Sequence, residues 1–138
     1  MNLHPALLLA SMAATALLPV AAQAATPSPA PVAAPRLADL APLAGLTGER
    51  RVTPIGQYAA TRVMQLQLKA GTRMPAHSAP ERVLVVVLAG RGSFGFGAEQ
   101  VALHERQVLH MAPGEEHAVS AETDLELLLV RIDETTPG

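Results

Sequence analysis

Apolar residues recur at every second position along much of the last two thirds of the chain. Met64, Leu66 and Leu68 alternate with Gln65 and Gln67, which is the pattern of a strand with one face in the core and a more polar opposite face. Because this spacing has a period of two and not the period of a helix, it predicts β-structure.

Further strands are expected at short, regular intervals. The run 83–88 is apolar on both faces and ends at Gly90, so it predicts a strand that is covered on both sides. Shorter strands follow, separated by turns with glycine or acidic residues: 93–96, 100–103, 107–111, 117–120 and 125–132. About seven or eight strands at this spacing predict an all-β fold, a closed sheet or a sandwich, and we expect a single antiparallel β-barrel of the jelly-roll type.

The first quarter of the chain has a different composition. No charged residue precedes Arg36, and residues 3–20 are dominated by Leu, Ala and Met. Small residues flank Gln23 in the pattern that signal peptidases accept, so residues 1–24 are expected to be a signal peptide that is cleaved after Ala24. An uncleaved membrane anchor is the alternative, because the apolar stretch approaches the roughly 20 residues that span a bilayer.

Residues 25–35 contain four prolines and no charge, which is the composition of an extended linker. The folded domain is therefore expected over residues 36–138, with its core at about 58–132. An exported domain of this kind is periplasmic or secreted and makes no membrane contact once the signal peptide is removed. A homodimer is expected, because pairing through a sheet edge or an apolar face would add to the modest core of a domain of about 100 residues.

Composition excludes several classes of function. The formal net charge of −2 gives no basic excess for a phosphate backbone, and one Tyr and two Phe are too few for a base-stacking platform, so nucleic acid is not an expected partner. The absence of cysteine excludes disulfides, thiol nucleophiles and thiolate metal sites. Imidazole and carboxylate groups remain as the strong metal ligands. The methionines at 64, 74 and 111 are expected to fill the core.

The candidate chemistry lies in two histidine-containing segments. Gly71 is followed by five residues and then His77, and Gly90 comes later in the same stretch. A second segment runs from Pro113 to His117. In these positions the chain resembles the cupin superfamily, whose two motifs read G-x5-H-x-H-x3,4-E-x6-G and G-x5-P-x-G-x2-H-x3-N. Five motif positions carry other residues in this chain: Ala79, Val83, Arg106, Ala112 and Ala121.

The resemblance implies a barrel with a site in its mouth. In metal-binding cupins, three His and one Glu at the motif positions hold Mn, Fe, Ni, Cu or Zn, and this chain keeps only His77 and His117. Glu81 would supply a third ligand if residues 77–83 formed one extended strand, since alternate residues then share a face. That set of two histidines and one carboxylate is the ligand group of non-haem Fe(II) oxygenases. His110 is the candidate acid–base group, because it would join the cluster if its strand turned that face inward.

Three functions remain open at this point. The favoured one is an exported cupin-like protein that binds a small polar or anionic molecule between His77 and His117, with His110 and Glu81 as further contacts and no robust catalysis. The alternative is a metal-dependent oxygenase or isomerase with His77, Glu81 and His117 as ligands. The third is a structural homodimer. Whether the protein is an enzyme stays open, because cupins host metalloenzymes, isomerases, sugar binders and storage proteins.

Overall fold

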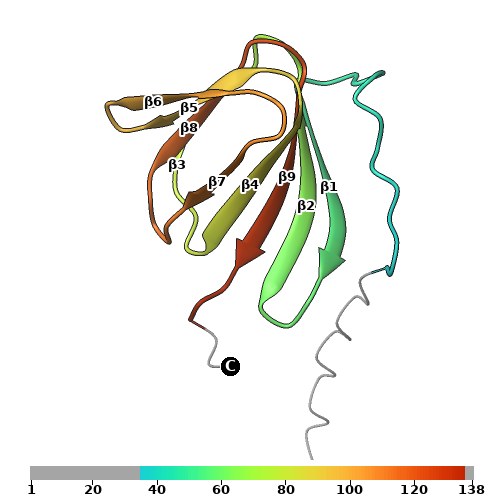
Figure 1. Ribbon diagram of the computed structural model, residues 1–138, viewed down its shortest axis with the longest axis vertical. Helices are drawn as coiled ribbons and strands as arrows, with labels where there is room; N and C mark the ends of the chain where they lie inside the picture. The colour runs from blue at the N-terminus through green and yellow to red at the C-terminus, as the bar shows by residue number, and fades with distance from the viewer. Residues whose placement is uncertain (1–34, 136–138) are drawn as a thin grey trace, which may run out of the picture.

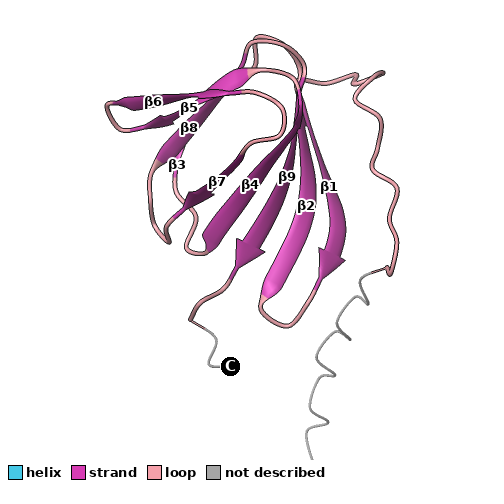
Figure 2. Ribbon diagram, viewed as in Figure 1, coloured by secondary structure: helices cyan, strands magenta, loops and turns pink. Residues whose placement is uncertain are grey.

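The computed structural model describes residues 35–135. Most of the predicted linker and the whole of the predicted signal peptide lie outside this range, so both stay predictions. Within it the chain forms β-structure joined by turns and loops, and there is no helix long and apolar enough to cross a membrane (Figure 2). The nine strands are β1 (Arg50–Gln57), β2 (Thr61–Leu68), β3 (Arg73–His77), β4 (Arg82–Ala89), β5 (Gly92–Phe96), β6 (Glu99–Leu103), β7 (Val108–Met111), β8 (His117–Ala121) and β9 (Leu125–Ile132).

The strands form two antiparallel sheets that face each other (Figure 1). The larger sheet has the order β1-β2-β9-β4-β7, and the smaller sheet has the order β3-β8-β5-β6. The predicted all-β class and jelly-roll type are confirmed. The hydrogen-bonded ladders of the described residues do not close into a single barrel, because the pairing stops at the edge strands of each sheet.

The core lies between the two sheets and is built from alternate residues of the strands. The larger sheet contributes Leu66, Leu68, Val83, Val85, Val87, Leu125 and Leu127, all at most 5% exposed, and the smaller sheet contributes Phe94 and Val119. The prediction that 83–88 is covered on both sides is only half right. The inward valines are buried, but Leu84 and Val86 on the outer face remain partly exposed, because no second layer packs on that side.

The outer face of the larger sheet differs from the sequence expectation at β2. Gln65 and Gln67 were expected on the more polar face opposite the core, and both are fully buried there. The segment before β1 lies against them: the Nε2 atoms of Gln65 and Gln67 donate to the carbonyl of Ala41 at 2.8 and 2.9 Å. The same two Nε2 atoms donate to Oε2 of Glu126 at 3.1 and 2.8 Å. Buried amides need such partners, and only the folded chain supplies them.

Much of the rest of that outer face is apolar. Two cross-strand rows run over it, and they consist of Val63, Val130 and Leu84 in one row and of Leu128, Val86 and Val108 in the other. Val108 is 66% exposed. The expected homodimer, through a sheet edge or an apolar face, stays a prediction.

Candidate functional site

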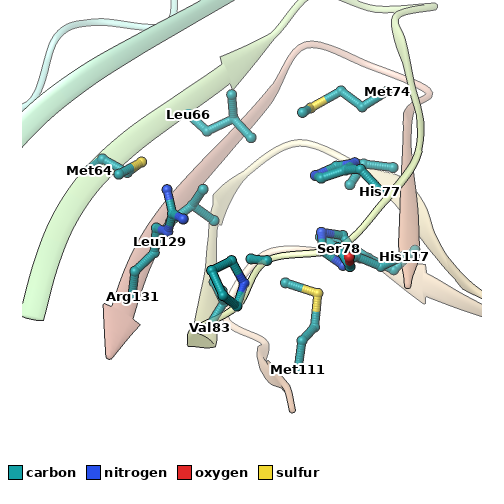
Figure 3. Close-up of a pocket in the computed structure, with 14 residues that line it drawn as sticks. Met64, Leu66, Met74, His77, Ser78, Val83, Met111, His117, Leu129 and Arg131 are labelled. Atoms are coloured by element: carbon teal, nitrogen blue, oxygen red, sulfur yellow. The ribbon is translucent and has the colours of Figure 1, made fainter. Parts of the chain in front are cut away.

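A cavity of about 190 Å³ lies between the two sheets. Its walls are mostly apolar, and its polar groups are the imidazoles of His77 and His117, the hydroxyl of Ser78 and the guanidinium of Arg131. Figure 3 shows the two histidines on one side of this cavity, with Met64 and Arg131 on the other. Such a hollow, apolar with a few convergent polar groups, is the usual form of a small-molecule site.

The two histidines come from neighbouring strands of the smaller sheet. His77 is the last residue of β3, His117 is the first residue of β8, and the two are direct cross-strand partners. Their ring centroids are 4.3 Å apart, with an angle of 61° between the ring planes. His117 is buried and His77 is exposed, so the pair runs from the interior of the cavity to its mouth. The sequence prediction that these residues come together is therefore supported by their geometry.

A β-bulge in β3 determines which other side chain of this strand faces the cavity beside the histidine pair. Met74 pairs with Val119 and His77 pairs with His117, so three steps along β3 match two steps along β8. In a regular strand, residues three apart lie on opposite faces. The extra residue in β3 turns Met74 and His77 to the same side, and both line the cavity.

Backbone hydrogen bonds fix both imidazoles. Nδ1 of His77 donates to the carbonyl of Pro75 at 2.9 Å, and Nδ1 of His117 donates to the carbonyl of Glu115 at 3.0 Å. A carbonyl can only accept a hydrogen bond, so Nδ1 carries the proton in each ring. In the neutral rings, Nε2 is then the atom that can accept a hydrogen bond or ligate a metal.

His117 stays neutral at lower pH than an ordinary histidine. Burial, the largest effect, lowers the pKa of His117, and the proximity of His77 lowers this pKa further. The hydrogen bond to the Glu115 carbonyl opposes the shift because it favours the protonated ring. At neutral pH the inner Nε2 is therefore an acceptor.

Arg131 occupies the opposite wall of the cavity. Its Nη2 donates to Oε2 of Glu81 at 2.6 Å, and Arg62 donates to the other carboxylate oxygen of Glu81 at 3.3 Å. The hydrogen bond from Arg131 is the main reason that the pKa of Glu81 lies below its ordinary value. The Nε–H of Arg131 is buried and has no hydrogen-bond partner within the described part of the chain. A buried donor without a partner costs about 1–3 kcal/mol, so the wall favours an occupant that offers an acceptor.

Glu81 does not lie with the histidines. The sequence argument placed it on their face by assuming one extended strand over 77–83, but β3 ends at His77 and β4 begins at Arg82. Glu81 falls in the connection between these strands, and its carboxylate binds the two arginines.

His110 does not join the histidines either. It lies on β7 opposite Leu84, on the exposed outer face, whereas its neighbour Met111 faces inward and lines the cavity. β7 therefore turns His110 away from the cavity, and His110 is not a third histidine of the cluster.

The comparisons with known proteins agree with this architecture. The family model described as the cupin domain matches residues 64–132, which is half of the chain and contains both histidines. The chain belongs to the cupin family. No curated protein matches this cupin.

Solved structures similar to this cupin share its fold. A conserved protein of unknown function from Streptococcus pyogenes is 20% identical, with a TM-score of 0.63 over 75% of this chain and 94% of that one. An RmlC-like cupin from Desulfovibrio desulfuricans is 25% identical, with a TM-score of 0.56 over 61% of this chain and 82% of that one. A variant of salicylate 1,2-dioxygenase from Pseudoaminobacter salicylatoxidans is 15% identical, with a TM-score of 0.59 over 63% of this chain and 27% of that one. At 15% identity, the likeness to the dioxygenase shows the fold alone.

The metal set that the cupin motifs imply does not fit these residues. Where three histidines and a glutamate would stand, this cupin has His77, Ala79, Val83 and His117, and Ala79 and Val83 both line the cavity. Across residues 35–135, no three His, Asp or Glu side chains form a group able to hold a metal ion. Hard divalent ions in proteins take three or more nitrogen or oxygen ligands, so two imidazoles beside apolar walls are a poor site for them.

Sequence reasoning missed two features of the cavity. Arg131 was not a candidate, because only the pairing of β9 with β2 and β4 brings it to the wall. The methionines were expected to fill the core, which holds for Met111 and for Met74 packed against it, but not foreseen was that all three described methionines also line the cavity. The sequence signal was the position of Met74 three residues before His77. These two side chains share a face only because of the bulge in β3.

Proposed function

We propose that this cupin is a binding protein for a compact organic acid that carries a hydroxyl group. The hydroxyl would donate its one proton to Nε2 of His117, and the acidic group would lie toward Arg131. The observation that carries the proposal is the pair of imidazoles with Nδ1 tied to backbone carbonyls, which presents two acceptors to one small cavity. An imidazole nitrogen that accepts favours a donor group on the ligand.

The size of the cavity limits the ligand. A cavity of 150 Å³ holds benzene, so 190 Å³ accommodates about eight non-hydrogen atoms, and the open mouth at His77 allows a small group to project. The apolar walls, which include Leu66, Phe94 and Leu129, favour a ring or a short hydrocarbon body. A single ring with one hydroxyl and one carboxylate has ten non-hydrogen atoms, so it offers these groups and would place part of itself in the open mouth of the cavity.

The test uses para-hydroxybenzoate as the probe and benzoate as its matched analogue without the hydroxyl. In calorimetric titrations, para-hydroxybenzoate should bind about three- to tenfold more tightly, since one hydrogen bond to a buried acceptor contributes about 0.5–1.5 kcal/mol. His117→Ala should remove that preference. His110→Ala is the control, because His110 lies on the outer face, and it should leave both affinities unchanged.

Imidazole nitrogen spectra provide an independent measurement. Binding should shift the Nε2 resonances of His77 and His117. It should leave in place those of His110 and of His104, an exposed residue just after β6 that does not line the cavity. The proposal is wrong if millimolar para-hydroxybenzoate moves none of the cavity resonances, or if benzoate binds as tightly as its hydroxylated analogue.

We also propose that the chain is exported and loses residues 1–24. The support is the uncharged, apolar sequence before Arg36 and the small residues around Gln23. N-terminal sequencing of the mature protein should begin at Ala25, and retention of Met1 would overturn export with cleavage.

A further inference from the structure

A second hollow adjoins the cavity of the two histidines. It has a volume of about 540 Å³ and lies where β1 and β3 begin. Met74 and His77 line both the cavity and this second hollow, so the second hollow continues the mouth of the cavity. Figure 3 shows these two side chains next to each other at one end of the cavity. The other residues that line the second hollow are Glu49, Arg50, Thr72, Arg73 and Pro75.

Two arginines flank the second hollow on a fixed backbone. Arg50 is the first residue of β1, and Arg73 is the first residue of β3. The residues that precede them are joined, because the hydroxyl of Thr72 donates to the carbonyl of Glu49 at 3.2 Å. The N–H of Lys69 donates to the same carbonyl at 2.9 Å. These bonds link the two sheets at their edges and bring two arginines that are distant in the sequence to one hollow.

Neither of these guanidinium groups has a partner in the part of the chain that the structure describes. The side chains of Arg50 and Arg73 make no hydrogen bond and no ion pair there, whereas those of Arg62, Arg82 and Arg131 bind carboxylates. A lone exposed arginine is commonly a solvated surface charge. Two that share a hollow can instead bind one acidic group between them.

The charges around the second hollow leave a positive excess. Its arginines carry two positive charges, and Glu49 carries the negative charge that opposes them. Among the described residues, the carboxylate of Glu49 forms no ion pair with Arg50 or Arg73. Both guanidinium groups therefore remain available to an acidic group that enters from solvent.

We propose that the second hollow is a subsite for a second acidic group of the ligand, which Arg50 and Arg73 bind while the ring of the ligand occupies the cavity. This inference rests on the proposed function, which places the hydroxyl at His117 and the first acidic group toward Arg131. It narrows the ligand class to a hydroxylated ring acid that carries a further carboxylate on a short arm. The arm would leave the cavity past His77, since His77 is exposed and lines both spaces.

A carboxylate suits the second hollow because the forked guanidinium group can bind it through two parallel hydrogen bonds. The probe is para-hydroxybenzoate with a carboxymethoxy arm ortho to its hydroxyl, and the matched probe carries the primary amide of the same arm, which has the same size and no charge. In calorimetric titrations at low salt, the acid should bind about three- to tenfold more tightly than the amide, since exposed ion pairs each contribute modestly. This advantage should decline in about 0.5 M sodium chloride, because salt screens exposed charges.

Arg50→Gln with Arg73→Gln should abolish the advantage of the acid, and binding of the amide serves as the internal reference for the fold of this variant. The charge-matched control is Arg36→Gln with Arg91→Gln. It removes two exposed arginines that line neither the cavity nor the second hollow, so the acid should keep its advantage. Glu49→Gln should raise the affinity for the acid by about twofold, since it removes the opposing negative charge.

The subsite is refuted if the acid and the amide bind the wild-type protein equally tightly, or if Arg50→Gln with Arg73→Gln retains the advantage of the acid. The wild-type comparison and its salt dependence decide the question even if the double variant fails to fold. If para-hydroxybenzoate is preferred over benzoate but the acid has no advantage over the amide, only the subsite is wrong. If para-hydroxybenzoate and both probes fail to bind, the proposed function is wrong and the subsite with it.

Discussion

Arg106 holds a strained backbone conformation that glycine would relieve. It is the one residue other than glycine with a positive φ, +70°, among residues 35–135, and it stands where the family motif has a glycine. Left-handed backbone costs a residue with a Cβ about 1–2 kcal/mol. We therefore predict that Arg106→Gly stabilises this cupin.

The magnitude follows from two opposing effects. Glycine removes the local strain, but it gives the unfolded chain more conformational freedom, which costs about 0.5–1 kcal/mol. The backbone hydrogen bond from the Arg106 N–H to the carbonyl of Val87, 3.0 Å long, needs no side chain and is kept. The net gain should be about 0.5–1 kcal/mol, or about 2–8 °C in Tm for a domain of this size.

Urea denaturation followed by circular dichroism measures the change in the free energy of unfolding. Arg106→Ala is the first control: it removes the same charge but retains the Cβ, so it should not be stabilising. Gly97→Ala is the reverse control, because Gly97 has a φ of +60° and open space for a Cβ, and it should destabilise by about 1 kcal/mol. Equal stabilities of Arg106→Gly and Arg106→Ala would refute the reasoning.

Three further predictions concern other parts of the fold. Gly90→Ala should destabilise by more than about 2 kcal/mol in urea denaturation, because its Cβ would lie 2.0 Å from the carbonyl oxygen of Asp124; a wild-type midpoint would contradict this. Glu126→Ala should cost about 1.5–3 kcal/mol and speed hydrogen exchange at the Ala41 amide, since it removes the carboxylate that binds Gln65 and Gln67; unchanged exchange would contradict it. The pKa of Glu81 is lower in the folded protein than in the unfolded chain, so the unfolded chain takes up the proton first as pH falls. Ionised Glu81 therefore stabilises the fold above the ordinary carboxyl pKa, and this stabilisation is lost at acid pH. Glu81→Gln should flatten this acid limb of the stability profile, and an unchanged slope would exclude Glu81 as its source.

The strands were predictable because their signal is local. Alternation at Met64, Leu66 and Leu68 follows from the two-residue repeat of a strand, and Gly90 ends the next apolar run where its neighbours leave no room for a Cβ. The pairing of His77 with His117 was also predictable, through the spacing of two short motifs that the chain shares with cupins.

The rest of the site depends on contacts between distant segments. Glu81 was misplaced because the interpretation assumed one extended strand over 77–83, whereas the chain breaks between β3 and β4, around Pro80. Gln65 and Gln67 match an exposed face in the sequence, but a segment 24 and 26 residues away supplies their partners and buries them. Such long-range hydrogen bonds produce no pattern in the local sequence.

The sequence by itself determined the strands, the all-β class and the two histidines, because backbone pleating and motif spacing act over a few residues. Only the tertiary structure decided what surrounds those histidines. One extra residue in β3 turned Met74 toward His77, and the pairing of β9 brought Arg131 to the opposite wall. A shift of one residue reverses the face of every side chain beyond it, and whether it occurs is decided by packing against the partner strand.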